Sequence, residues 1–277
     1  MEETALYKGF QLICPICGAG LEQNGKSLVC ENHHGFDIAR QGYIHLLPVQ
    51  QKHSLSPGDT KEMLEARRRF LNAGKYQPIC ESVINAIRKY APCAHPVLVD
   101  IGCGEGYYTS AFEQNCGAKC IGIDIAKDGA KMSCARSKNA VWLVATASQL
   151  PIADHSADIV TAMFSLLLQE EYARILKSGG CVVEVTVGSQ HLIELKSIIY
   201  EEVFQQDKHP EPCGDCFDEV ECTEYQYNIT LDNDELKNLL LMTPHFWRIR
   251  QERREQLENT ERLALTIHYW VRVLKKK

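Results

Sequence analysis

The sequence has no apolar run of the roughly 20 residues needed to cross a bilayer. Residues 1–8 form no apolar signal region, so we expect a cytoplasmic protein. Internal repeats and low-complexity segments are also missing, and the hydrophobic (45%) and charged (24%) fractions are ordinary globular values. With a net charge of −6 the chain is not basic throughout, although a local basic region can still hold nucleic acid.

Cysteine, in contrast, is abundant. The 277 residues include 13 cysteines. The number is odd, the chain is long and no export signal is present, so metal binding and reduced thiols fit better than a framework of disulfides.

Residues 97–106 are the most informative stretch. An apolar strand containing Asp100 leads into glycines at alternate positions, Gly102, Gly104 and Gly106, with Glu105 before the last of them. Glycine lets a backbone turn tightly and approach a ligand, and a strand followed by such a loop and a helix is typical of a nucleotide-type cofactor site. The G-x-G-x-G spacing resembles the first motif of class I S-adenosylmethionine-dependent methyltransferases. A plain tight turn is the alternative interpretation.

Asp124 ends the next strand, 20 residues after Gly104. A carboxylate near that distance accepts hydrogen bonds from ribose hydroxyls in related folds, and we favour this role over a helix N-cap. The loop after the third strand contains Ser148, Gln149 and Leu150. In class I methyltransferases this loop lies beside the adenine, so these residues are predicted to bind it, with a solvated loop as the alternative.

Strands and helices alternate after residue 96. We expect strands at 97–101, 119–123, 141–145, 158–163 and 180–186, helices at 106–115, 127–137, 169–176 and 190–204, then a strand at 224–230, a helix at 232–241 opened by Asp232 or Asp234, and a strand at 263–273. This pattern predicts an α/β fold with helices on both sheet faces. The resemblance implies a class I (Rossmann-like), seven-stranded, mostly parallel sheet.

The front of the chain differs from this body. We expect a small zinc-binding module at 1–50, a linker and helices at 51–95, and the methyltransferase domain at 96–277. The first of these helices is predicted to have Asp59 as its N-cap, with Glu62 completing a capping box, and to stop near Gly74. Pro78 suits the first turn of the next helix.

Cys14 and Cys17 form a C-x-x-C turn, and Cys30 and His34 follow with C-x3-H spacing. These four can complete a tetrahedral zinc shell, with His33 as the rival fourth ligand. A full protein shell would make the zinc structural, and metal would supply much of the folding energy of so small a module.

A second group, His209, Cys213, Cys216 and Cys222, could also bind metal. We favour a cysteine-rich loop over the active site, and expect the other cysteines, Cys103 included, to be small buried apolar residues.

The chain as a whole resembles the bacterial 23S rRNA (guanine-N1)-methyltransferases, the RlmA-like proteins. The resemblance rests on Cys14-Pro-Ile-Cys17, Pro57-Gly58-Asp59, Ala66-Arg67-Arg68, Tyr76-Gln77-Pro78, the glycine loop, and Met242-Thr243-Pro244 with Trp247-Arg248. It implies a zinc module that recognises RNA, S-adenosylmethionine and Zn²⁺ as cofactors, 23S rRNA as partner, a homodimer and, in some members, macrolide resistance.

The resemblance also places Tyr76 against the cofactor, with a core tyrosine as the alternative, and His191 at a cleft position after the fifth strand. Two departures fall at the expected guanine pocket: Ser165-Leu166 where members commonly carry a Ser-Pro or Ala-Pro step, and Ser189-Gln190 in place of the family's Gly-Pro-x-His-Leu run.

The hypothesis is methyl transfer to N1 of an unpaired guanine in 23S rRNA. The N1 proton must leave, but no general base is identified. Phosphate contacts are expected from Lys52, Arg67, Arg68, Arg69 and Lys75, with a solvated helix face as the alternative. There are two alternatives to this hypothesis. The chain could be a small-molecule methyltransferase, which has no need of a zinc module, or a non-catalytic zinc RNA-binding protein that keeps the methyltransferase fold.

Overall fold

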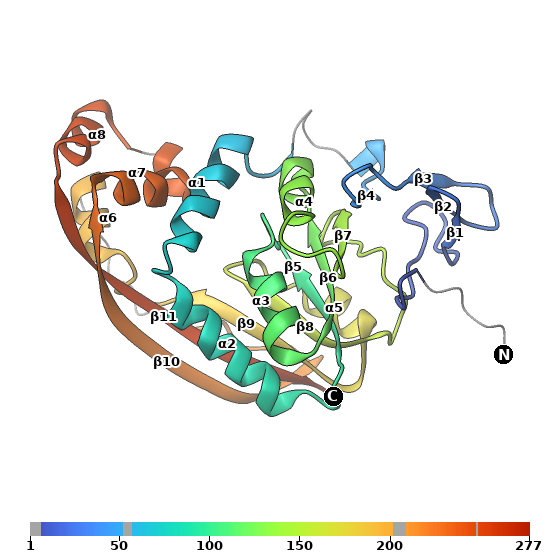
Figure 1. Ribbon diagram of the computed structural model, residues 1–277. Coiled ribbons are helices and arrows are strands. Elements are labelled where there is room, and N and C mark those ends of the chain that lie inside the picture. Colours follow the sequence, from blue (N-terminus) through green and yellow to red (C-terminus); the bar gives the residue numbers. More distant parts are fainter. Residues whose placement is uncertain (1–6, 52–56, 202–208, 248) are drawn as a thin grey trace.

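The computed structural model describes residues 7–51, 57–201, 209–247 and 249–277. Its centre is an eight-stranded sheet with the order β10-β11-β9-β8-β5-β6-β7-β4 (Figure 1). Neighbours from β9 to β4 run parallel, whereas β10, β11 and β9 pair antiparallel. The mostly parallel sheet is confirmed, but the expected number of seven strands is wrong by one.

The central strands overlap their predicted positions, although β9 begins four residues earlier than predicted. They are β5 (Val97–Ile101), β6 (Lys119–Asp124), β7 (Val141–Val144), β8 (Ala157–Met163) and β9 (Leu176–Val187). Successive side chains alternate between two apolar cores: Leu98 packs with one and Val99 with the other. A strand buried on both faces therefore reads as a continuous apolar run.

Helices cover both faces of the sheet, as expected. α2 (Gln77–Tyr90), α3 (Tyr107–Cys116) and α4 (Lys127–Ser133) pack on one face, and α5 (Gln169–Ile175) packs on the other. Pro78 lies in the first turn of α2, and its apolar residues Ile79, Val83, Ile84 and Ile87 are buried. α4 ends four residues before its predicted end.

The C-terminal part adds two long strands, β10 (Phe217–Asp232) and β11 (Arg262–Lys276). α6 (Ile193–Ile199), α7 (Asn233–Leu241), η2 (Pro244–Trp247) and α8 (Gln251–Glu258) cluster at one end of them. Asp232, one of the two expected openers, caps α7 in a capping box with Glu235. α6 is shorter at both ends than the predicted helix 190–204, of which residues 202–204 lie outside the described residues.

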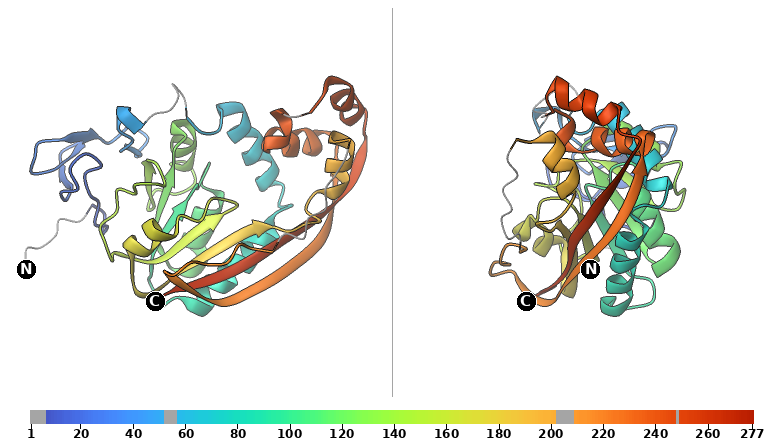
Figure 2. Two further views of the ribbon diagram at one scale, coloured as in Figure 1. Left: turned by 180° about the vertical axis from the view of Figure 1, so that it is seen from behind. Right: turned by 90° about the vertical axis from the view of Figure 1, so that its left-hand side faces the viewer.

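The front segment contains β1 (Glu22–Asn24), β2 (Ser27–Val29) and β3 (Gly35–Asp37) in a separate small sheet. β4 (Ile44–His45) instead joins the main sheet beside β7, and η1 (Val49–Gln51) follows. Further contacts tie the segment down, including a bridge between Leu12 and Ile152. Figure 2 shows this segment at the opposite end of the molecule from α8.

The N-cap of α1 (Lys61–Asn72) lies one residue later than predicted. Thr60, not Asp59, is its N-cap, and the Thr60 hydroxyl accepts a hydrogen bond from the Met63 amide. Asp59 is turned away into an ion pair with Arg67, so the expected capping box is wrong. Within the described residues, no helix combines the length and apolarity needed to cross a membrane.

Candidate functional site: a four-residue metal cluster and a cofactor cleft

The small front sheet surrounds a cluster of four metal-ligand side chains. One ligand atom from each of Cys14, Cys17, Cys30 and His34 lies within 4.8 Å of the others. His34 Nδ1 is 3.5 Å from the sulfurs of both Cys14 and Cys30. His33, with φ of +61°, is not part of the cluster. Three thiols and an imidazole are a donor set that suits tetrahedral zinc.

The two sulfurs of the C-x-x-C turn have different environments. Burial raises the pKa of Cys14 to about 11, whereas the Asn32 side chain, whose amide lies 3.4 Å from Cys17 Sγ, helps lower the pKa of Cys17 to about 6. A thiolate is the form that binds metal. The lowered pKa of Cys17 favours the form that a metal would bind.

His209, Cys213, Cys216 and Cys222 do not form a second metal cluster. Among the described residues, Cys14, Cys17, Cys30 and His34 are the only group of potential ligands that lie close enough to share a metal ion. The His209 ring lies 5.0 Å from the Trp270 ring, while Cys213 and Cys216 pack against the α5-side core. The Gly214 amide donates to Gln169 at the start of α5. Among the remaining cysteines Cys103 is buried as expected, but Cys93 is exposed.

The glycine loop between β5 and α3 needs its glycines. Gly102, Gly104 and Gly106 have φ of +74°, +56° and +84°, a region that other residues rarely adopt. A Cβ on Gly106 would lie 2.8 Å from Ser133 Oγ and 2.9 Å from the Trp142 ring, so side chains close the loop from behind. The same Cβ on Gly104 would find its nearest neighbour, Arg67, 3.8 Å away.

Two carboxylates hold this loop. Asp100 is fully buried and accepts hydrogen bonds from Thr109 (2.5 Å) and Thr161 (2.7 Å), while burial raises its pKa to about 6. Asp124 accepts from the Gly104 amide at 2.8 Å and the Ala126 amide at 2.7 Å. Burial also raises the pKa of Asp124. Ala126, not Asp124, is the N-cap of α4.

A cleft of about 310 Å³ opens over the loop. It is lined by residues from the glycine loop, α1, α3 and the ends of β6 and β8: Gly58, Asp59, Arg67, Leu71, Gly102, Cys103, Glu105, Tyr107, Tyr108, Asp124, Ile125, Met163, Phe164 and Ser165. Among the described residues five buried side-chain atoms lack a hydrogen-bond partner. Three of them, Arg67 Nε, Glu105 Oε1 and the Tyr108 hydroxyl, belong to residues that line this cleft.

Unpaired buried polar atoms are costly, so they mark a place where a polar ligand completes the structure. The cleft offers acidic side chains from Asp59, Glu105 and Asp124 and one basic side chain, Arg67, among its described lining residues. S-adenosylmethionine carries ribose hydroxyls, two cationic groups and one carboxylate. The residues present therefore fit this cofactor.

Of the predicted cofactor residues, Gly102, Glu105 and Asp124 line the cleft. The other eight do not: Asp100, Gly104 and Gly106, described above, and Tyr76, Ser148, Gln149, Leu150 and His191. Tyr76 and His191 are buried, and their rings lie 6.5 Å and 6.3 Å from that of Phe164, which does line it. Leu150 lies in the core, and its amide donates to Glu171. Ser148 pairs with Thr146, and Gln149 accepts from Gln51, both at the exposed surface. Side-chain packing of this kind leaves no local trace in the sequence.

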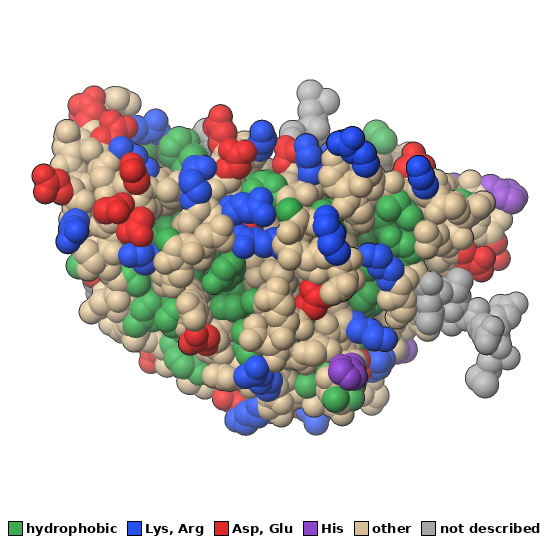
Figure 3. Space-filling model, in the orientation of Figure 1, with side chains coloured by type: hydrophobic (Ala, Val, Ile, Leu, Met, Phe, Trp, Pro, Cys, Tyr) green, Lys and Arg blue, Asp and Glu red, His purple; other side chains and the backbone are tan. Residues whose placement is uncertain are grey.

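The predicted phosphate-binding residues have different positions. Arg67 pairs with Asp59 and the Met242 carbonyl inside the cleft wall. Arg68 and Arg69 line an open groove of about 350 Å³ between α1 and α4, with Lys61 and Lys131. Figure 3 shows Lys and Arg side chains gathered over this region. Lys75 pairs with Glu235. Lys52 lies outside the described residues.

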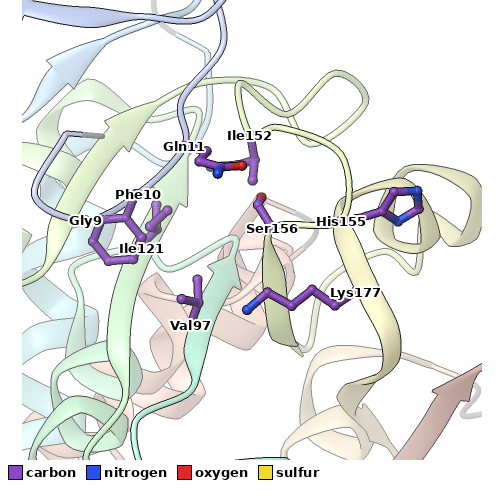
Figure 4. A pocket seen from close by; sticks show the side chains of 9 residues that line it. All are labelled: Gly9, Phe10, Gln11, Val97, Ile121, Ile152, His155, Ser156 and Lys177. Atoms are coloured by element: carbon purple, nitrogen blue, oxygen red, sulfur yellow. The ribbon is translucent and has the colours of Figure 1, made fainter. Parts of the chain in front are cut away.

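A further hollow of about 240 Å³ lies at the amino end of β5, away from the glycine loop (Figure 4). Its charged lining residue, Lys177, pairs with Asp158 at 2.9 Å, and Asp158 also accepts from the Val97 amide. These contacts lie within the main sheet, and Gly9, Phe10 and Gln11 of the front segment line the same hollow.

Comparison with known proteins gives two family matches. Residues 12–55 match the zinc-ribbon family described as "RlmA, N-terminal", and residues 99–183 match the family "Methyltransferase domain". The first range contains all four members of the metal cluster, and the second contains the glycine loop and Asp124.

Individual relatives cover both parts. The 23S rRNA (guanine(748)-N(1))-methyltransferase of Streptomyces fradiae is 31% identical over 85% of this chain and 85% of its own length. YxjB of Bacillus subtilis (strain 168), assigned to the 23S rRNA (guanine-N(1)-)-methyltransferases, is 29% identical over 96% and 97%. A malonyl-[acyl-carrier protein] O-methyltransferase of Hahella chejuensis is 26% identical but covers only 46% of this chain. The likeness that spans both the metal cluster and the cleft is thus with the rRNA enzymes, and the chain belongs to the 23S rRNA (guanine-N1)-methyltransferase family.

Proposed function

We propose that this protein transfers the methyl group of S-adenosylmethionine to N1 of a guanine in 23S rRNA. The observation that carries the proposal is the cleft over the glycine loop. Its lining includes one basic and three acidic side chains, and three of its lining residues have a buried polar atom without a hydrogen-bond partner. The zinc-ribbon match at residues 12–55 favours an RNA substrate over a small molecule.

When bound, S-adenosylmethionine supplies an already electrophilic methyl group, so the main task of the chain is alignment. Asp124 is suited to accept hydrogen bonds from the ribose hydroxyls. Arg67, whose Nε is free of partners among the described residues, suits the cofactor carboxylate.

We propose that Cys14, Cys17, Cys30 and His34 hold Zn²⁺. All four positions of a tetrahedral shell would then be filled by protein, so the metal would stabilise the front segment rather than take part in transfer. The groove between α1 and α4, with Lys61, Arg68, Arg69 and Lys131, is the proposed contact for RNA phosphates.

The proposed substrate places the protein in the cytoplasm, with the ribosome or its precursors. A homodimer is proposed from the family resemblance and is tested by light scattering of the purified protein. A single monomer mass across the micromolar range would contradict it.

Primer extension on 23S rRNA tests the reaction, because a methyl group on N1 blocks base pairing and stops reverse transcriptase. Incubation of purified protein and S-adenosylmethionine with unmodified 23S rRNA, naked or in ribosomal particles, is expected to create a stop at one guanine. The Asp124→Asn variant serves as the matched control. Absence of a stop on every form of the RNA would overturn the proposal.

A further inference from the structure

Phe164, at the carboxyl end of β8, has an unusual backbone. Its φ is +55°, a region in which a bulky residue is strained. Such strain persists only where the surrounding structure fixes it, and it concentrates at ligand-binding sites. The Phe164 amide still donates to the Val185 carbonyl at 2.9 Å, so the residue is held in the sheet up to this point.

The Phe164 side chain is also unusually exposed. It is 39% accessible, and Leu166, two residues later, is 77% accessible. These are two of the five large exposed hydrophobic residues among those described. Both follow β8 directly, and Phe164 lines the cofactor cleft together with Gly102 and Ser165. An apolar surface therefore stands at the mouth of the cleft.

Two buried rings support Phe164 from behind. The Tyr76 ring lies 6.5 Å away at an angle of 44°, and the His191 ring lies 6.3 Å away at 31°. Tyr76 and His191 are themselves 6.4 Å apart. Because both supporting side chains are buried, the Phe164 ring is held firmly on one side while the other part remains open.

An aromatic ring held in place beside the methyl-donor site can bind a planar group by stacking. Proteins hold unpaired bases by stacking them on aromatic side chains. We propose that Phe164 is the surface on which the acceptor base stacks once it has left its neighbours in the RNA. This inference rests on the proposed function and adds the residue that recognises the plane of the base.

Two variants separate stacking from simple apolar contact. Phe164→Leu removes the ring but keeps an apolar side chain on the same backbone, and Phe164→Tyr keeps the ring. Methyl transfer to 23S rRNA and binding of S-adenosylmethionine by calorimetry are measured for each. Phe164→Leu is expected to lower kcat/KM at least about fivefold, with cofactor affinity unchanged, whereas Phe164→Tyr stays near the wild-type value.

The outcomes are distinguishable. Transfer by Phe164→Leu within twofold of wild type would overturn the inference and leave the proposed function intact. A loss of cofactor affinity as large as the loss of transfer would show that Phe164 acts through the cofactor rather than the base, and would also overturn it. An equal loss of transfer in Phe164→Leu and Phe164→Tyr would show that the aromatic ring does not determine transfer, and would overturn the inference. Lack of transfer by the wild-type protein would refute the proposed function itself.

Discussion

Replacing Gly106 by alanine tests whether the glycine loop is shaped by packing from behind. The new Cβ would meet Ser133 and Trp142 at 2.8–2.9 Å, closer than real Cβ contacts allow. The φ of +84° adds a left-handed cost of about 1–2 kcal/mol, and overpacking of a buried site adds about 1–3 kcal/mol. We therefore expect the free energy of unfolding to fall by about 2–5 kcal/mol.

Gly104→Ala is the matched control. Its φ of +56° carries the same backbone cost, but the nearest atom to the new Cβ is Arg67 Cδ at 3.8 Å. The free energy of unfolding of this variant should fall by only about 1–2 kcal/mol. Urea unfolding followed by circular dichroism measures both variants. Equal destabilisation of the two would refute the argument that Ser133 and Trp142 limit the space at Gly106.

Three further predictions follow from the site. A strong zinc chelator, or Cys17→Ala, should lower the melting temperature, whereas Cys93→Ala, at an exposed cysteine outside the cluster, should not; an unchanged Cys17→Ala melting curve would argue against a metal. Arg67→Met should weaken calorimetric binding of S-adenosylhomocysteine about tenfold but leave methylthioadenosine, which lacks the carboxylate, unaffected; equal losses would contradict the assignment. Burial lowers the folded pKa of His191 to about 3, below its usual value near 6.5. Only the unfolded chain then takes up a proton as pH falls below 6.5, so stability should drop by about 2 kcal/mol by pH 5, and His191→Gln should remove this drop in urea midpoints at pH 7 and 5.

The parts of the fold that were predictable are those with local signals. β5 and β6 lie where apolar runs predict them, because a strand buried on both faces needs apolar residues throughout. β4 could not be found, because Ile44 and His45 are too short a run to signal a strand and pair with residues nearly 100 positions away. The cap of α1 depended on Arg67, which draws Asp59 away and leaves Thr60 to take its place.

The candidate site follows the same division. The metal cluster and the glycine loop depend on spacing within one segment, so their residues lie together as the sequence suggests. The orientation of the Arg67 side chain depends instead on its contacts with Asp59 and Met242. The burial of Leu150 depends on α5, where Glu171 accepts a hydrogen bond from the Leu150 amide. Phe164 was missed as a candidate, although an aromatic residue ending the strand next to a glycine loop could have indicated it.

The pairing of β4 with β7 has a consequence for synthesis of the chain. The four metal-cluster residues all lie within the first 34 residues synthesised, so all the ligands are present before most of the chain has been made. β4 must then wait until β7, ending at Val144, has left the ribosome. During that interval the front segment depends on its metal rather than on the sheet. The metal cluster is thus complete about 110 residues of synthesis before the sheet contact that anchors the same segment.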